Sequence, residues 1–317
     1  VPTTGHGNNH KRSTIMQLSL GAVQYFWPKQ ELLDFYEAMV QQPLDRIYLG
    51  ETVCSKRREM RWQDWLELAR FVEAHGIQVV LSSLTLIEAQ SELKQLTKLC
   101  QQDEFLVEAN DMGAVNVLSQ QGKPFVTGPA INIYNGRSLR LLQKLGLTRW
   151  TMPVELSKTS LEDTLNQAQQ LTDEPLPETE VFAFGQLPLA YSARCFTARQ
   201  RNLAKDDCGF CCIETPQGID INSQDGTPLF TLNGIQTLST KVYDLSREVD
   251  ALKSVGVTSL RISPLALDTQ DAIQRFKQAI DGTQRQSDEA MIPLMDVSQS
   301  QLTCNGYWYG EPGMAVK

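Results

Sequence analysis

The residues best suited to chemistry are cysteines that gather in one stretch of the chain. Four of the seven, Cys195, Cys208, Cys211 and Cys212, share a polar, glycine-containing segment with several basic residues, Arg194, Arg199, Arg201 and Lys205. Nearby cations favour the thiolate, which is the form that binds metals. The alternative is a set of small buried residues with one disulfide. Core cysteines do not ordinarily gather in a polar stretch, so a metal site is favoured.

A fifth cysteine, Cys54, stands 141 positions before Cys195, beside the basic run Lys56 to Arg58. It follows the apolar segment 46–51, which has the composition of a strand. Whether Cys54 can reach the other thiols depends on the elements that carry them.

Short apolar segments alternate with amphipathic ones along most of the chain. The predicted strands cover 18–26, 46–51, 78–82, 105–109, 124–128, 149–155, 180–185 and 259–263. The predicted helices cover 28–41, 62–74, 86–100, a short segment from 112, 138–145, 161–171, 242–255 and 269–280. Eight such units predict an α/β fold, a TIM-like (β/α)8 barrel, in preference to a doubly wound sheet. Neither Gly-x-Gly-x-x-Gly nor a P-loop occurs.

The alternation breaks at about 186–238, between the seventh strand and its helix. This insertion contains the cysteine-rich stretch and then a predicted β-hairpin, 218–222 and 228–232, around Asp225-Gly226. Because the carboxyl ends of barrel strands share one face, Cys54 is expected to meet the insertion. The candidate ligands are Cys54, Cys195, Cys208 and Cys212, with Cys211 as the alternative to Cys212.

Four thiolates suit structural Zn²⁺ or a [4Fe–4S] cluster. Zinc ribbons use two short Cys pairs, and only Cys208 with Cys211 or Cys212 forms such a pair here. Scattered ligands flanked by arginines favour the cluster, because cations offset its negative charge. With four cysteine ligands no iron is left open to a substrate, which favours electron transfer or structural support over direct catalysis by this chain. No catalytic residue is assigned from the sequence.

Bulk properties exclude several classes of function. The 317 residues are 41% hydrophobic and 21% charged, which is typical of a globular protein, and no apolar run is long enough to span a membrane. A formal charge of −8 argues against broad nucleic-acid binding. Seven cysteines without a secretory signal indicate reduced thiols and a cytoplasmic location.

Residues 1–15 are polar and read as a tag or non-native extension, with Met16 as the natural first residue and 16–317 as a single barrel domain. Of the three histidines, His6, His10 and His75, only His75 then belongs to the folded part, at an expected helix end. A zinc protease of the His-Glu-x-x-His type is excluded because the motif is absent.

Several long motifs resemble the collagenase-like peptidase family, in its branch for oxygen-independent ubiquinone biosynthesis. They are Ile47-Tyr-Leu-Gly-Glu-Thr-Val-Cys-Ser-Lys-Arg-Arg58, Met152-Pro-Val-Glu-Leu-Ser157, Leu187-Pro-Leu-Ala-Tyr-Ser-Ala-Arg-Cys-Phe-Thr-Ala-Arg199, Leu232-Asn-Gly-Ile-Gln-Thr237 and Cys304-Asn-Gly-Tyr-Trp308. The resemblance covers essentially everything from Met16 onward. It implies a [4Fe–4S] cluster on Cys54, Cys195, Cys208 and Cys212, and a heterodimer with a UbiU-like paralogue. That complex would hydroxylate ubiquinone precursors anaerobically, with a lipid-carrier-like accessory protein.

The chain departs from the broader family at Phe184-Gly-Gln-Leu-Pro188, where relatives often carry a cysteine. Cys54 is expected to replace that ligand, and peptidase activity is not expected. A zinc-stabilised, non-catalytic scaffold or binding subunit remains the alternative function. Cys100 and Cys304 are interpreted as structural. Packing or interface roles are expected for Trp62, Trp65 and Tyr307 to Tyr309. Possible substrate contacts are Glu51, Asn132 and Glu155.

Overall fold

A computed structural model describes residues 16–266, 269–283 and 303–317 of the chain. Residues 1–15, expected to be a tag or extension, lie outside the described residues.

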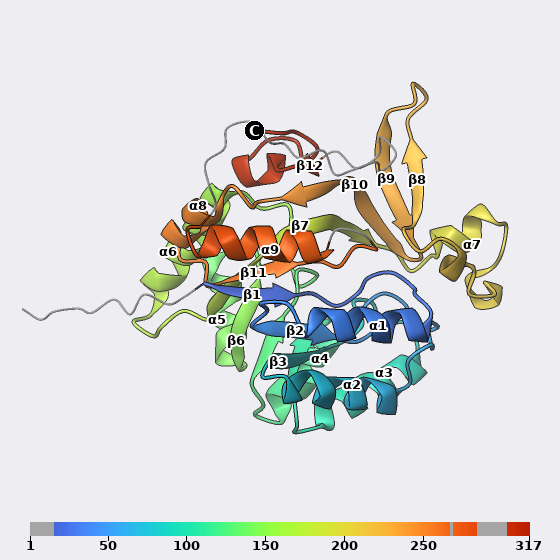
Figure 1. The fold of residues 1–317 in the computed structure, drawn as a ribbon. Coiled ribbons are helices and arrows are strands. Elements are labelled where there is room, and N and C mark those ends of the chain that lie inside the picture. Colours follow the sequence, from blue (N-terminus) through green and yellow to red (C-terminus); the bar gives the residue numbers. More distant parts are fainter. Residues whose placement is uncertain (1–15, 267–268, 284–302) are drawn as a thin grey trace, which may run out of the picture.

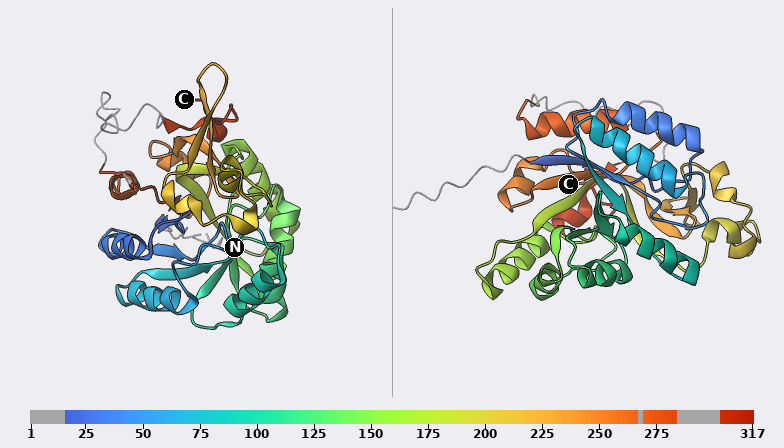
Figure 2. Two further views of the ribbon diagram at one scale, coloured as in Figure 1. Left: turned by 90° about the vertical axis from the view of Figure 1, so that its right-hand side faces the viewer. Right: turned by 90° about the horizontal axis from the view of Figure 1, so that it is seen from below.

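Eight parallel strands close into a barrel, with the helices around it (Figures 1 and 2). The strands are β1 (Gln17–Leu20), β2 (Arg46–Leu49), β3 (Gln78–Ser82), β4 (Leu106–Ala109), β5 (Phe125–Thr127), β6 (Leu147–Thr151), β7 (Glu178–Tyr191) and β11 (Ser259–Ile262). Each pairs with the next, and β11 pairs in parallel with both β1 and β7. The TIM-barrel fold expected from the sequence is therefore confirmed.

The helices lie where apolar side chains recur at helical spacing. They are α1 (Lys29–Met39), α2 (Trp62–Ala74), α3 (Gln90–Gln101), α4 (Met112–Gln120), α5 (Gly136–Lys144), α6 (Lys158–Leu171), α7 (Phe196–Gln200), α8 (Val249–Ser254) and α9 (Thr269–Ile280). Helix α2 has its predicted bounds. The Arg61 N–H donates to Asp64 at 2.7 Å at its start, and Gly76, with φ +79°, follows its end. In the described ranges, every helix is too short or too polar to cross a membrane.

The predicted break after the seventh strand is an antiparallel extension of the barrel sheet. Strand β7 runs on to Tyr191 and pairs with β10 (Gln236–Asp244), which pairs with β9 (Pro228–Asn233), and β9 pairs with β8 (Ile219–Asn222). The β8–β9 hairpin stands out from the barrel in Figure 1. Its turn is closed by Ser223 N–H donating to Thr227 O at 2.9 Å, as the Asp-Gly pair predicts. Strand β12 (Thr303–Cys304) pairs with the later part of β10, on the edge opposite β7.

Several predicted bounds were wrong, and three elements differ most from the structure. The first strand ends at Leu20 instead of residue 26, and its pairing with β11 closes where the Gly21 N–H donates to Ile262 O at 2.8 Å. The helix predicted over 242–255 covers only Val249–Ser254, since Val242 pairs with Gln186 and Thr303 on its two sides. Sheet pairing there overrides helix propensity.

The seventh strand is also longer than the predicted 180–185. It continues through Pro188, a residue that cannot donate to a ladder. Pro188 lies opposite Leu238, where the register with β10 shifts on both sides. The irregular pairing accommodates the missing N–H donor, so the strand continues beyond Pro188 although a proline ordinarily ends a strand.

Candidate functional site

The cysteine-rich segment forms a lobe of short helices between β7 and β8. After α7 it contains two 3-10 turns, η1 (Lys205–Asp207) and η2 (Cys211–Glu214). In Figure 1 this lobe lies beyond the end of the barrel toward which the β1 and β11 arrows point. The turn before β10 anchors it, because the Phe196 N–H donates to Gly234 O at 2.8 Å and the Gly234 N–H to Thr197 Oγ1 at 2.9 Å.

Local backbone geometry orients the thiols of this lobe. The Cys195 sulfur accepts from the Ala198 N–H at 3.5 Å and thereby caps α7. The Cys211 N–H donates to Cys208 O at 3.2 Å, which folds the second group of cysteines into one turn. Phe210 in that turn has a left-handed φ of 57°, next to Gly209, which also has φ 57°. Within this turn Cys211 is buried, whereas Cys208 and Cys212 are half-buried.

The loop after β2 carries Cys54 and is held by a half-buried carboxylate, that of Glu51. Glu51 Oε1 accepts the N–H of Val53 at 2.8 Å and of Cys54 at 3.1 Å. The Arg57 N–H donates to Cys54 O at 3.0 Å, so the thiol sits in a closed turn. Burial raises the pKa of Glu51, opposed by Arg57 and these two amides. Glu51, expected as a possible substrate contact, orders the Cys54 loop through these two hydrogen bonds.

Ion pairs join this loop to the cysteine lobe. Lys56 Nζ lies 2.7 Å from Asp206 Oδ1 and 2.8 Å from Lys205 O. Lys205 in turn pairs with Glu88, which follows β3, and donates to Ala193 O at 3.0 Å. The carboxyl ends of β2 and β3 and the lobe after β7 therefore meet at one rim, as expected for Cys54.

The thiols at this rim are close enough to affect one another's ionisation. Burial is the main factor that raises the pKa of Cys54 and of Cys212. Cys195 raises both pKa values further, and Cys54 also raises the pKa of Cys212. Arg57 lowers both pKa values and so opposes these effects. Asp206 is the main cause of the raised pKa of Lys56, and Cys208 raises it further. The pKa of Cys211 is raised mainly by burial, and Cys208 raises it further. These influences connect Cys54 with Cys195 and Cys212, which belong to a segment far along the chain.

The donor set has the composition that a thiolate-bound metal or cluster requires. The seven cysteines are free, and Cys54, Cys195, Cys208 and Cys212 are half-buried at the rim, whereas Cys211 is buried. They are gathered but not closed into a coordination sphere. In the described parts of the chain, no three His, Cys, Asp or Glu side chains stand ready to hold a metal ion. Binding would thus include a local closing of the lobe onto the Cys54 loop.

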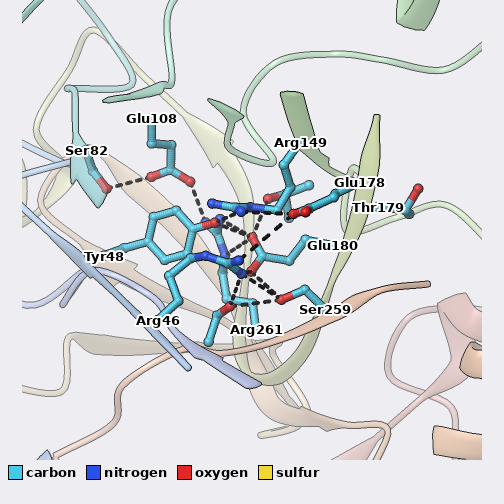
Figure 3. A network of polar contacts seen from close by, with 12 residues as sticks. Arg46, Tyr48, Ser82, Glu108, Arg149, Glu178, Thr179, Glu180, Ser259 and Arg261 are labelled. Atoms are coloured by element: carbon cyan, nitrogen blue, oxygen red, sulfur yellow. Dashed lines mark hydrogen bonds and ion pairs between the residues drawn. The ribbon is translucent and has the colours of Figure 1, made fainter. Parts of the chain in front are cut away.

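A second polar centre fills the barrel interior (Figure 3). The Glu180 carboxylate accepts from Tyr48 Oη at 2.7 Å and from Arg261 Nε at 3.1 Å. Arg261 Nη1 also donates to Glu108 at 2.6 Å, and its guanidinium carbon lies 3.9 Å from the Tyr48 ring centroid. Arg149 Nε reaches Tyr48 Oη at 3.1 Å. One arginine thus bridges two buried carboxylates beneath the rim.

This network continues to the barrel mouth. Glu108 and Arg261 line a cavity of about 30 Å³ together with Thr52, Asn110 and Tyr191. Asn110 Nδ2 donates to Glu108 Oε2 at 3.2 Å and to Ser83 O at 3.0 Å. A cavity of this size suits a water or a very small polar group. The charged interior and the thiol rim are therefore neighbouring layers.

Comparison with known proteins places this architecture in a family. The sequence profile described as peptidase family U32 matches residues 32–316. The chain belongs to peptidase family U32. The match covers the barrel strands from β2 onward and the whole cysteine lobe.

Solved structures share the barrel with this U32 chain at low identity. A U32 peptidase is 12% identical, with a TM-score of 0.44, over 82% of this chain and 97% of its own. Dihydropteroate synthase from Thermus thermophilus is 12% identical, with a TM-score of 0.42, over 86% and 94%. Thiamine phosphate pyrophosphorylase from Pyrococcus furiosus is 8% identical, with a TM-score of 0.43, over 85% and 98%. These likenesses concern the fold alone.

Other residues singled out in the sequence lie away from the thiol rim of this U32 member. Cys100 and Cys304 are buried, and burial raises the pKa of each to about 11, which fits a structural role. His75 caps the end of α2 and its Nδ1 lies 2.8 Å from Phe71 O, as expected. Glu155 is exposed and bonds Tyr134, and Asn132 is exposed.

Sequence reasoning missed the interior charges and the role of Arg57. A signal for the interior charges was present in the sequence, because three strands carry polar residues two positions apart. These pairs are Arg46 and Tyr48 in β2, Glu178 and Glu180 in β7, and Ser259 and Arg261 in β11. That spacing directs both members of each pair to one face of the strand. Arginines expected to act near the thiols, Arg194 and Arg199, are exposed, whereas Arg57 is buried beside Cys212.

Proposed function

We propose that this chain is a UbiV-like [4Fe–4S]-binding subunit of an oxygen-independent hydroxylase that acts on ubiquinone precursors. The observation that carries the proposal is the contact of the Cys54 loop with the cysteine lobe at one end of the barrel, where Lys56 Nζ lies 2.7 Å from Asp206 Oδ1 and 2.8 Å from Lys205 O. Membership of the U32 family and the motifs around Cys54 and Cys195 support it. The partner would be a UbiU-like paralogue in a heterodimer, working in the cytoplasm with a lipid-carrier-like accessory protein.

The proposed ligands are Cys54, Cys195, Cys208 and Cys212. Cys211 is the less suitable thiol because it is buried in the lobe, whereas the other four are partly accessible. A [4Fe–4S] cluster supplies one-electron transfer when bound. The chain would contribute positive charge from Lys56 and Arg57, which flank the rim and favour thiolates. This chain would thus carry electrons to, or support, the chemistry of its partner.

Anaerobic purification tests the cofactor. The expected result is a brown protein that contains iron and sulfide in equal amounts and is bleached by dithionite. Stoichiometric zinc without visible absorption would overturn the iron–sulfur proposal and favour the scaffold alternative.

Single cysteine substitutions test the ligand set. Cys54→Ala, Cys195→Ala, Cys208→Ala and Cys212→Ala should each lose most of the iron, while Cys211→Ala should retain it. Cys304→Ala is the matched control, because that cysteine is buried beside β10 away from the rim. Loss of iron from Cys211→Ala with retention in Cys212→Ala would show that the ligand choice is wrong.

Co-purification and activity test the subunit role. The tagged chain should capture a second U32-family chain from anaerobically grown cells and should be inactive without it. Full hydroxylation of a ubiquinone precursor by the isolated chain would contradict the proposal. Cleavage of denatured collagen by the isolated chain would instead support a peptidase.

A further inference from the structure

A cavity of about 390 Å³ lies between α2 and α3, outside β2 and β3, and it has no place in the function proposed above. It lies within the range of volumes found for small-molecule sites. Its lining comes from both helices and from the loops that follow β2 and β3. Each of these loops also joins the rim described above, and the lining includes Ser55, the neighbour of Cys54 in sequence.

The walls of the cavity are largely apolar. They include Met60, Trp62, Trp65, Leu84, Ile87 and Leu99. Both tryptophans, Ile87 and Leu99 are only partly buried and pack against the barrel core with their inner sides. Their outer sides therefore face the cavity, where a ligand would cover apolar surface that water now contacts.

The opening of the cavity is cationic. Arg58, Arg61 and Lys98 line it and are exposed. Through 16–266, 269–283 and 303–317, none of the three forms a salt bridge. The Lys98 ammonium lies 5.3 Å from the centroid of the Trp62 ring. Positive charge thus stands directly at the edge of the apolar wall.

The two carboxylates in the lining, Glu51 and Glu92, only partly offset this charge, and both are held by hydrogen bonds to other groups. Glu92 accepts from Ser55 Oγ at 2.5 Å and from the N–H groups of Glu88 and Ala89 at 2.6 and 3.0 Å. Glu51 accepts the amides of its own loop. The lining contains four cations, Arg57, Arg58, Arg61 and Lys98, against these two carboxylates, so its net charge is positive and complements an anionic group.

We propose that this cavity binds a small amphiphile, an aromatic or other apolar body that carries one anionic head group. The apolar body lies against Trp62, Trp65 and Leu99, and the head group pairs with Arg58, Arg61 and Lys98. The site does not depend on any bound metal or cluster. Because Ser55 and Arg57 line the cavity and flank the Cys54 turn, an occupant would contact the loop that holds this thiol.

A matched pair of fluorescent probes tests both halves of the proposal. 8-Anilinonaphthalene-1-sulfonate has an aromatic body with a sulfonate, and N-phenyl-1-naphthylamine has the same body without it. Titration of the full chain should give saturable 1:1 binding of the anionic probe, tighter than the neutral probe by about tenfold or more. Equal affinity for the two probes, or no saturable binding, would overturn the proposal.

Substitutions locate the site. Leu99→Trp and Ile87→Trp fill the cavity from α3 and from the β3–α3 loop, and each should abolish binding of both probes. Arg61→Gln and Lys98→Gln should weaken the anionic probe about fivefold each and leave the neutral probe unchanged. Lys94→Gln, on the same helix but outside the lining, and Arg137→Gln, exposed on α5, are the charge controls.

The near-ultraviolet circular dichroism of every variant should match that of the original chain, which separates loss of the site from loss of the fold. A properly folded Leu99→Trp or Ile87→Trp variant that binds the anionic probe with undiminished affinity would place the probe elsewhere and refute the proposal. Equal weakening by Lys94→Gln and Lys98→Gln would refute the role of the cationic opening.

Discussion

Arg57 donates a hydrogen bond from Nη2 to Asn233 Oδ1 at 2.7 Å, across a separation of 176 residues. The two side chains share a third partner, because Arg57 Nη1 and Asn233 Nδ2 both donate to Gln24 O at 2.8 Å. The triangle joins the loop after β1, the Cys54 loop and the end of β9. It therefore fixes where Cys54 stands relative to the cysteine lobe.

We predict that Arg57→Gln loosens this junction. The side chain is 2% exposed, so its loss leaves buried acceptors unpaired and should lower the free energy of unfolding by about 2–3 kcal/mol. Urea unfolding measures the change, and limited proteolysis should cut the segment 192–217 faster. Arg58→Gln, exposed and one residue on, is the control. Equal stability of the two variants would show that the three hydrogen bonds among Arg57, Asn233 and Gln24 do not stabilise the fold.

Much of the fold follows from the sequence because its signals are local. Helix α2 has the predicted bounds, since apolar spacing, a first-turn Asp64 and Gly76 all act within one segment. The opposite case is Val242, which lies in a strand because β7 and β12 flank it. No local pattern contains those neighbours.

The candidate site divides in the same way. The position of Cys54 at the rim was predictable, because the carboxyl ends of parallel barrel strands face one side. The role of Arg57 was not, because it depends on Asn233 in a hairpin whose position is set by the irregular pairing of β7 with β10. The pairing of Arg261 with both Glu108 and Glu180 likewise requires the closed barrel.

A second prediction concerns the interior network. Glu180→Gln removes the carboxylate that faces Arg261 and leaves buried positive charge with fewer partners. The free energy of unfolding should fall by about 3–5 kcal/mol. Glu178→Gln is the matched control, because the Glu178 side chain is 52% exposed although it too pairs with Arg149. A loss for Glu180→Gln no larger than for Glu178→Gln would contradict the central role of Glu180.

The same carboxylate predicts a dependence on pH. Burial favours the neutral form of Glu180, but Arg261, Arg149 and Arg46 outweigh it and hold its pKa well below the usual range. A carboxylate whose pKa is lower in the folded chain than in the unfolded chain stabilises the fold at pH values above its unfolded pKa, about 4.3. This stabilisation is lost as the pH falls through the folded pKa. Between pH 5 and 3, stability should therefore fall more steeply in the original chain than in Glu180→Gln, by up to about 1.4 kcal/mol per pH unit. Parallel urea curves for the two proteins across this range would contradict the prediction.

A fourth prediction tests the close contact that aims the Cys54 loop. Gly50 follows β2 with φ +137°, and a Cβ there would lie 2.6 Å from Ser82 O on β3. Gly50→Ala should destabilise the chain by about 3 kcal/mol, from strain and backbone displacement together. Gly122→Ala provides the control, since Gly122 has φ +65° with open space around it and should lose only about 1 kcal/mol. Thermal unfolding distinguishes them, and similar losses would show that contact with Ser82 is not limiting.

The last prediction joins metal content to the stability of the cysteine lobe. The thiols are gathered at the rim but not closed into a ligand set in the described ranges, so a bound metal or cluster would complete the closure. Removal of the group by anaerobic chelation should therefore speed proteolysis of 192–217 and lower the unfolding temperature, while the barrel keeps its far-ultraviolet circular dichroism. The Cys304→Ala variant, treated in the same way, should respond as the original chain does. The Cys54→Ala variant should already show the fast proteolysis before chelation and change little after it. A lobe that is cut at the same rate with and without the group would show that the thiol rim does not tie the lobe to the barrel.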